Sequence, residues 1–215
     1  MPSVDPTEAS YAAMLAACKD ALVRLLSFLE DDFGFDDLTV VFSGGRGYHV
    51  HVRDEDVRTL DSTARREVVD YVRAIDLDTD GLIRTVADRG TTKRVLETEG
   101  GWGARVHEAL VEYAHDLRAM DESTARDRLM ELDGIGEGRA ETILGAFERN
   151  PDAVREGNVE AGGPGVRRLV AALVSRVTAT ETAPIDEPVP TDTERLLRVP
   201  GDLHGGPGIG RAPVR

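Results

Sequence analysis

Two short strand-like runs joined by a glycine-rich turn constrain the fold of this chain more than any other feature. Leu38–Phe42 is rich in β-branched residues and predicts a buried strand. Residues 48–53 alternate apolar and polar side chains and predict a second strand. This alternation separates two faces, with Tyr48, Val50 and Val52 on one and His49, His51 and Arg53 on the other. Residues 43–47 contain three glycines and predict a tight turn between the strands.

Helical patterns surround this predicted hairpin. Residues 11–33 carry apolar side chains at helical spacing and predict one long amphipathic helix, which ends near Gly34. A second helix is expected from Asp61 or Ser62 to about Ile75. A further short helix is predicted at 82–88, and the glycine- and threonine-rich segment 88–103 reads as a long irregular connection.

Three or four more helices are predicted between residues 105 and 178. Helices inserted between a strand-bearing first half and a returning last segment predict an α+β fold with an all-helical subdomain. We therefore expect three segments: a partial catalytic core at 1–104, a helical subdomain at 105–178, and a return to the core at 179–215.

The charge balance describes the solvent better than the ligand. Forty acidic residues against 26 basic ones give a net charge of −14, which at first argues against a nucleic-acid partner. However, Lys19 and Lys93 are the only lysines, and every other basic residue is arginine. An acidic, lysine-poor surface is typical of adaptation to a high-salt cytoplasm, where the screening length shrinks to about 3 Å. The local placement of arginine must therefore decide the ligand.

Other bulk features narrow the class of protein. No run of about 18 apolar residues is present, so no membrane partner is expected. Residues 1–10 show no signal-peptide pattern, and a cytoplasmic location is expected. Cys18 is the single cysteine, so an intramolecular disulfide is excluded, and its place in a helical pattern predicts a small core residue.

The glycine-rich turn carries the groups that a triphosphate requires. Glycines allow backbone N–H groups to converge on an anion. Ser43 adds a hydroxyl donor, Arg46 a forked guanidinium and His49 a ring donor. From the spacing alone, an exposed glycine-rich hairpin without a ligand explains these residues equally well.

These residues resemble a known family. The run Ser43-Gly44-Gly45-Arg46-Gly47-Tyr48-His49 is similar to the nucleotide-binding motif of the archaeal and eukaryotic DNA primase small subunit. The resemblance implies that Ser43, Arg46 and His49 bind the phosphates of the incoming nucleotide. Many family members have a second arginine where this chain has Gly45, so that contact is absent or supplied elsewhere.

A second motif follows about 140 residues later, at 185–189 and 195–205, and resembles the last motif of the same family. The resemblance implies that Asp186 ligates a catalytic metal and that Arg198 and His204 contact the nucleotide. Taken alone, Asp186 would be read as a solvated loop carboxylate. Asp202 stands where the family usually has serine, which puts one hydroxyl contact in doubt.

The resemblance implies a primase-type core with a mixed sheet and an inserted all-helical subdomain. It also implies an enzyme that makes short primers on a single-stranded DNA template from nucleoside triphosphates, with Mg²⁺ or Mn²⁺ and a primase large subunit as partner. The family holds two metals with three carboxylates, two of them in an Asp-x-Asp pair on a strand before the long first helix. Before that helix this chain has Asp5 alone. The family also continues into further core structure after the position of Gly208. We therefore expect a chain truncated at both ends and inactive by itself.

An acidic segment at residues 76–81 could be mistaken for the missing pair. It follows the glycine-rich turn instead of preceding it. Its start also resembles a calcium loop, but Ala87 stands where such a loop needs glutamate. We interpret the segment as a solvent-facing acidic turn at a helix end.

The helical region contains a second DNA-related pattern. Residues 129–144 resemble a helix–hairpin–helix, in which a Gly-Ile-Gly turn can bind a DNA phosphate without reading bases. The candidate phosphate contacts are Gly134, Gly136, Gly138 and Arg139. A plain helix–turn–helix packing unit is the alternative, because acidic residues crowd the turn. This unit supports the rival function, a non-enzymatic DNA-binding or scaffold fragment.

Overall fold

The computed structural model of the chain describes residues 8–45, 47–88, 90–160, 163–186 and 188–191. Arg46, Arg198 and His204 therefore lie outside the described residues. The chain divides into two compact units, one formed by residues 1–75 and 182–215 and the other by residues 76–181. This division places its boundaries after residues 75 and 181, whereas the three expected segments met after residues 104 and 178. Residue 104 lies inside a helix.

The first unit begins with the predicted long helix. Helix α1 (Glu8–Ser27) continues into a π-helical turn, η1 (Phe28–Asp32), and Gly34 follows with φ +68°. A positive φ is accessible to glycine at little cost, so the chain can leave the helix there. The predicted helix at 11–33 is confirmed, and Cys18 on it is half-buried.

The predicted hairpin is also confirmed. Strands β1 (Leu38–Phe42) and β2 (Tyr48–Val52) pair antiparallel, with Val41 opposite His49 and Phe42 opposite Tyr48. Residues directly opposite share a face, so the register reproduces the predicted separation of Tyr48 from His49. Burial differs from the expectation, because within β1 Val41 alone is fully buried, at 1% exposed.

The core of the first unit gathers where η1 meets α2 (Ser62–Val72). Phe28 and Tyr71 meet edge to face with ring centroids 6.1 Å apart, and the Tyr71 hydroxyl donates to Asp32 at 3.0 Å. Asp61 caps α2 by accepting from the N–H groups of Thr63 and Ala64. The predicted cap is confirmed, but the helix ends at Val72 and not near Ile75. The 3₁₀ turn η2 (Asp56–Thr59) precedes α2. The short helix α8 (Pro188–Thr191) packs against α2.

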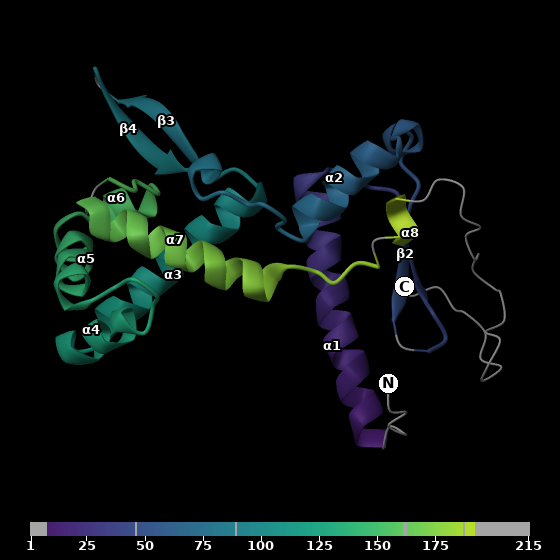
Figure 1. Cartoon of the computed structure of the whole chain (residues 1–215), viewed down its shortest axis with the longest axis horizontal. Helices are drawn as coiled ribbons and strands as arrows, with labels where there is room; N and C mark the ends of the chain where they lie inside the picture. Colours follow the sequence, from purple (N-terminus) through teal and green to yellow (C-terminus); the bar gives the residue numbers. More distant parts are fainter. Residues whose placement is uncertain (1–7, 46, 89, 161–162, 187, 192–215) are drawn as a thin grey trace. The chain divides into compact units, whose positions relative to one another are not determined.

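The second unit opens with a hairpin that was not predicted from the sequence. After η3 (Asp80–Leu82), strands β3 (Ile83–Asp88) and β4 (Thr91–Leu96) pair antiparallel around Gly90, which has φ +86° (Figure 1). The helix predicted at 82–88 and the irregular connection at 88–103 are therefore wrong. The physical reason is that Ile83, Thr85 and Val86 are β-branched, and a glycine with positive φ turns the chain back after one short strand.

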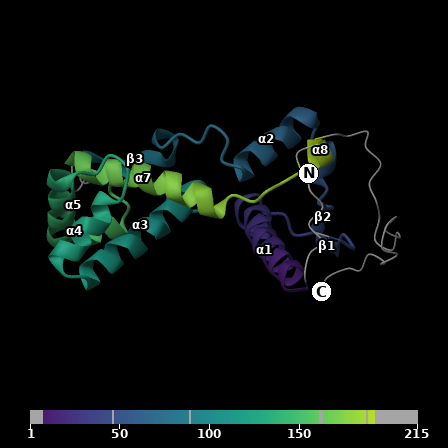
Figure 2. The same ribbon diagram turned by 60° about the horizontal axis from the view of Figure 1, so that its bottom comes forward.

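Five helices follow in the described part of this unit, against the three or four expected: α3 (Gly101–Ala119), α4 (Glu122–Met130), α5 (Glu137–Arg149), α6 (Pro151–Arg155) and α7 (Gly163–Glu181). Helix α7 lies along α3, and α5 packs against both (Figures 1 and 2). Their shared core contains fully buried Trp102, Leu110, Ile143 and Leu169.

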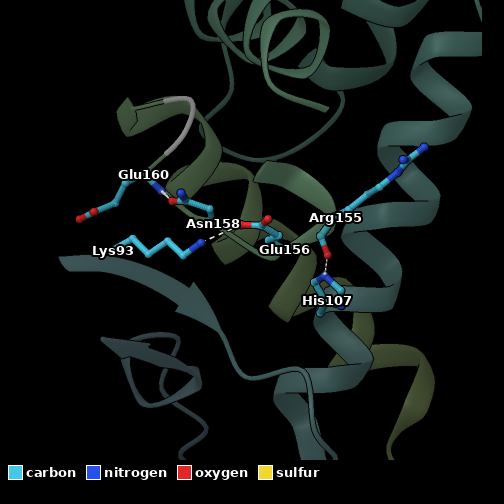
Figure 3. Close-up of polar contacts among 6 residues, drawn as sticks. All are labelled: Lys93, His107, Arg155, Glu156, Asn158 and Glu160. Carbon is cyan, nitrogen blue, oxygen red and sulfur yellow. Dashed lines mark hydrogen bonds and ion pairs between the residues drawn. The ribbon is translucent and has the colours of Figure 1, made fainter. Parts of the chain in front are cut away.

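A short segment after α6 attaches the second hairpin to the helices (Figure 3). The N–H of Leu96 donates to the carbonyl of Gly157 at 2.9 Å, and the N–H of Val159 donates to the carbonyl of Arg94 at 3.1 Å. Lys93 pairs with Glu156 at 2.7 Å. In the same junction His107 Nε2 lies 2.7 Å from the carbonyl oxygen of Arg155. A carbonyl can only accept, so this nitrogen carries the proton.

The α+β class is confirmed. The described sheets are two separate antiparallel hairpins and not one mixed sheet. Each pair of strands is antiparallel because it is joined by a turn too short for a parallel crossover.

The acidic turn at residues 76–81 is confirmed as exposed, with Asp78 accepting from the N–H of Asp80. Among the described helices, none has the length and apolar character needed to cross a bilayer.

Replacing Gly103 by alanine tests how closely α3 packs on the end of β4. A Cβ at Gly103 would lie 2.6 Å from Cβ and 2.8 Å from the carbonyl oxygen of Glu97. We expect a loss of about 1–3 kcal/mol in the free energy of unfolding, typical of overpacking. Denaturant titration measures it. Gly138→Ala is the matched control, since no atom lies within 4 Å of its Cβ position. Equal stabilities of the two variants would contradict the close packing.

Candidate functional site

The turn between β1 and β2 is held together by Ser43. Its Oγ accepts from the N–H groups of Gly47 at 3.1 Å and Gly45 at 3.4 Å, and its own N–H donates to the carbonyl of Gly47 at 2.9 Å. Gly44, with φ +79°, makes this tight geometry possible. Because the hydroxyl oxygen accepts inside the turn, the hydroxyl proton can be donated to a ligand.

A tyrosine from α1 braces the same turn. The Tyr11 hydroxyl donates to the carbonyl of Gly45 at 3.0 Å, although the two residues are 34 positions apart. Tyr11 was not among the residues predicted from the sequence. No local signal could have identified it, since it occupies an ordinary position in a helical pattern. It fixes the orientation of the peptide that directly precedes Arg46.

His49 is the second predicted phosphate contact among the described residues. It lies on β2 opposite the buried Val41, two residues after Gly47, and is half-buried. The hairpin thus brings Ser43 and His49 to the same end of one short ladder. Arg198 and His204 fall outside the described residues, so their convergence with this hairpin stays a prediction.

Asp186, the predicted metal ligand, is exposed in the first unit, two residues before α8. Within the described part of the chain, no three or more His, Cys, Asp or Glu residues come together as a metal ion would require. A carboxylate is a suitable ligand for Mg²⁺ or Mn²⁺, but a single one does not make a two-metal site. The described residues therefore do not fit the implied metals, and no reaction step is assigned to them.

The second unit contains two helices, α4 and α5, joined by a short turn at the predicted place, which fits both a helix–hairpin–helix and a plain packing unit. Asp121 caps α4, and hydrogen bonds from Thr124 hold the pKa of its carboxyl below the usual value. Helix α5 begins after Gly136, which accepts from the N–H groups of Arg139 and Ala140. Between the helices, Gly134 has φ +76°, and Ile135 is 4% exposed and anchors the turn in the core.

An open hollow of about 560 Å³ lies at this turn. Its lining consists of residues 130–136 and Arg139. Arg139 donates from Nη1 to the carbonyl of Gly134 at 2.7 Å. Of the four predicted contacts, Gly134, Gly136 and Arg139 line the hollow, whereas Gly138 does not. Carboxylates at Glu131 and Asp133 share the lining, so the hollow is not uniformly basic.

A family model described as the DNA primase small subunit matches residues 3–215. The chain belongs to the DNA primase small subunit family. The resemblance seen in the two sequence motifs is confirmed.

Similar proteins named "DNA primase small subunit PriS" occur in several archaea. The chain is 79% identical to that of Halorubrum lacusprofundi over 214 residues, which cover 100% of this chain and 55% of the relative. It is 55% identical to that of Haloarcula marismortui, over 97% of this chain and 55% of the relative. It is 37% identical to that of Methanococcoides burtonii, over 93% of this chain and 54% of the relative.

Two points follow from these similarities. The most similar of these relatives come from halophilic archaea, in agreement with the high-salt adaptation read from the acidic, lysine-poor composition. The chain spans about half the length of the primase small subunits that it matches.

Proposed function

We propose that this chain is part of the catalytic subunit of a DNA primase and binds the triphosphate of an incoming nucleotide at the β1–β2 turn. The observation that carries the proposal is the Ser43-centred turn, with His49 at the same end of the hairpin. The N–H groups of Gly45 and Gly47 donate to Ser43 Oγ inside the turn, which leaves the hydroxyl proton of Ser43 to be donated to a phosphate oxygen. Arg46 lies in this turn by sequence.

Each donor has a distinct task. The Ser43 hydroxyl offers one hydrogen bond and the His49 ring another. Arg46 offers a forked, charge-assisted contact to two phosphate oxygens, and Arg198 and His204 add further donors if the second motif joins the site. In the whole enzyme the template would be single-stranded DNA, the product a short primer, and the partner a primase large subunit.

Titration calorimetry with a nucleoside triphosphate, at one fixed high salt concentration, tests the proposal. The matching nucleoside is the control, because it keeps the base and sugar and lacks the phosphates. We expect binding of the triphosphate and none measurable of the nucleoside. Equal affinity for both would contradict a phosphate site.

We expect the chain by itself to make no detectable primer on single-stranded DNA with Mg²⁺ or Mn²⁺. The reason is that Asp186 supplies one carboxylate, whereas each cation needs several oxygen ligands. Incorporation of labelled nucleotide, resolved by gel electrophoresis, measures the activity. The control is a whole primase small subunit, such as that of Halorubrum lacusprofundi, under the same conditions. Robust synthesis by this chain would refute the expectation.

A second candidate function is DNA binding without catalysis, at the α4–α5 hairpin. The observation that favours it is the open hollow at the Gly134 turn, which lies beside an arginine and the start of α5. A DNA phosphate could lie there without any base being read. This candidate is compatible with the first, because the two sites belong to different units.

A further inference from the structure

Two arginines from different helices contact the same glycine of the α4–α5 hairpin. Arg139 of α5 donates to the Gly134 carbonyl at 2.7 Å. Arg168 of α7 also lies against this residue, so close that a Cβ at Gly134 would overlap its guanidinium. The turn therefore depends on glycine twice, for its φ of +76° and for the space that Arg168 occupies.

We propose that Arg168 is a phosphate-contacting residue of this hairpin and forms a two-arginine clamp with Arg139. The proposal rests on the second candidate function, DNA binding at the α4–α5 turn, and deepens it. Arg168 lies 35 positions from Asp133 and outside the hairpin motif, so the motif alone does not identify it. The ligand is the phosphate backbone of a DNA strand.

The balance of charge around the turn indicates contact at short range. Three carboxylates lie in or directly beside the turn in the sequence, at Glu131, Asp133 and Glu137. Two guanidiniums contact it, those of Arg139 and Arg168. The carboxylates outnumber the guanidiniums, so the turn has no long-range attraction for DNA. High salt weakens long-range repulsion as well as attraction, because screening then acts within about 3 Å. Direct guanidinium–phosphate contacts, which are forked and charge-assisted, survive this screening best.

Asp133 holds Arg168 in place until a phosphate arrives. Its carboxylate lies 3.1 Å from Nη2 of Arg168, and its side chain is fully exposed. An exposed ion pair contributes little stability, about 0–1 kcal/mol, so a phosphate can replace the carboxylate as the acceptor. The pair keeps the guanidinium beside Gly134 in the free protein and competes weakly with the ligand.

Fluorescence anisotropy with labelled oligothymidylate tests the clamp. We expect Arg168→Ala in the whole chain to weaken binding about tenfold, the effect of losing one charge-assisted contact. The matched control is Arg155→Ala, which removes another exposed arginine of the same unit that pairs with Asp152 at 3.5 Å. An equal change in both variants would overturn the proposal.

Asp133→Asn tests the role of the carboxylate. We expect tighter binding of oligothymidylate than in Asp152→Asn, which makes the same change of charge away from the turn. This gain should disappear when Arg168→Ala is added, because the carboxylate acts through that arginine. The proposed role of the Asp133 carboxylate is contradicted if the gain in affinity persists without Arg168, or if it is no larger than that of Asp152→Asn. If the unaltered chain fails to bind oligothymidylate at all, the DNA-binding function itself fails, which is a different result.

Discussion

Replacing Arg46 by alanine is expected to weaken binding of a nucleoside triphosphate by about ten- to a hundredfold. A charge-assisted contact to arginine contributes about 1.5–3 kcal/mol, and 1.4 kcal/mol corresponds to about a factor of ten. The other donors of the turn, Ser43 and His49, remain in place, so binding should be weakened and not abolished. Titration calorimetry at a fixed salt concentration measures the change.

Two further variants make this result specific. Arg46→Lys should recover part of the affinity, because a point charge cannot make the forked contact. Arg66→Ala, on the exposed side of α2, removes the same charge from the same unit and should leave the affinity unchanged. If Arg46→Ala binds as tightly as the unaltered chain, Arg46 does not belong to the site.

The β1–β2 hairpin and α1 could be predicted because their signals are local. Alternating side chains set the two strands, and three glycines within five residues set the turn. Helical spacing of apolar residues likewise predicts α1, and Gly34 predicts where the helix ends. In each case the residues that decide the structure are neighbours in the sequence.

The β3–β4 hairpin could not be predicted in the same way. Residues 83–88 contain apolar positions that fit a helix as well as a strand. Distant partners add to the strand pairing, since Val95 of β4 forms a bridge with Asn158 and the N–H of Leu96 donates to the carbonyl of Gly157. Tertiary contacts over about sixty residues override an ambiguous local preference.

Candidate site residues show the same division. Ser43, His49, Gly134 and Arg139 were found because they belong to contiguous motifs. Tyr11 and Arg168 were not found, because each acts on a glycine turn from a helix at least 34 positions away. Their identity follows from packing, which brings one hydroxyl to Gly45 and one guanidinium to Gly134.

Because the chain divides into two compact units, we expect that the two proposed binding sites can be lost separately. Leu110 is completely buried in the core of the second unit. Replacing it by alanine should cost about 2–5 kcal/mol, because the removed methyl groups leave a cavity. Whole domains are stable by only about 5–15 kcal/mol, so this unit should unfold at much lower denaturant concentration. Oligothymidylate binding should be lost with it at intermediate denaturant.

Triphosphate binding should persist under those same conditions, because the glycine turn is anchored by Val41 and Tyr11 in the other unit. Calorimetry and anisotropy on one sample at intermediate denaturant distinguish the two activities. The control is Glu108→Ala on the exposed face of α3, which should change stability by no more than about 0.5 kcal/mol. Simultaneous loss of both activities in Leu110→Ala would show instead that the two units unfold together, because loss of the core of the second unit would then also unfold the first.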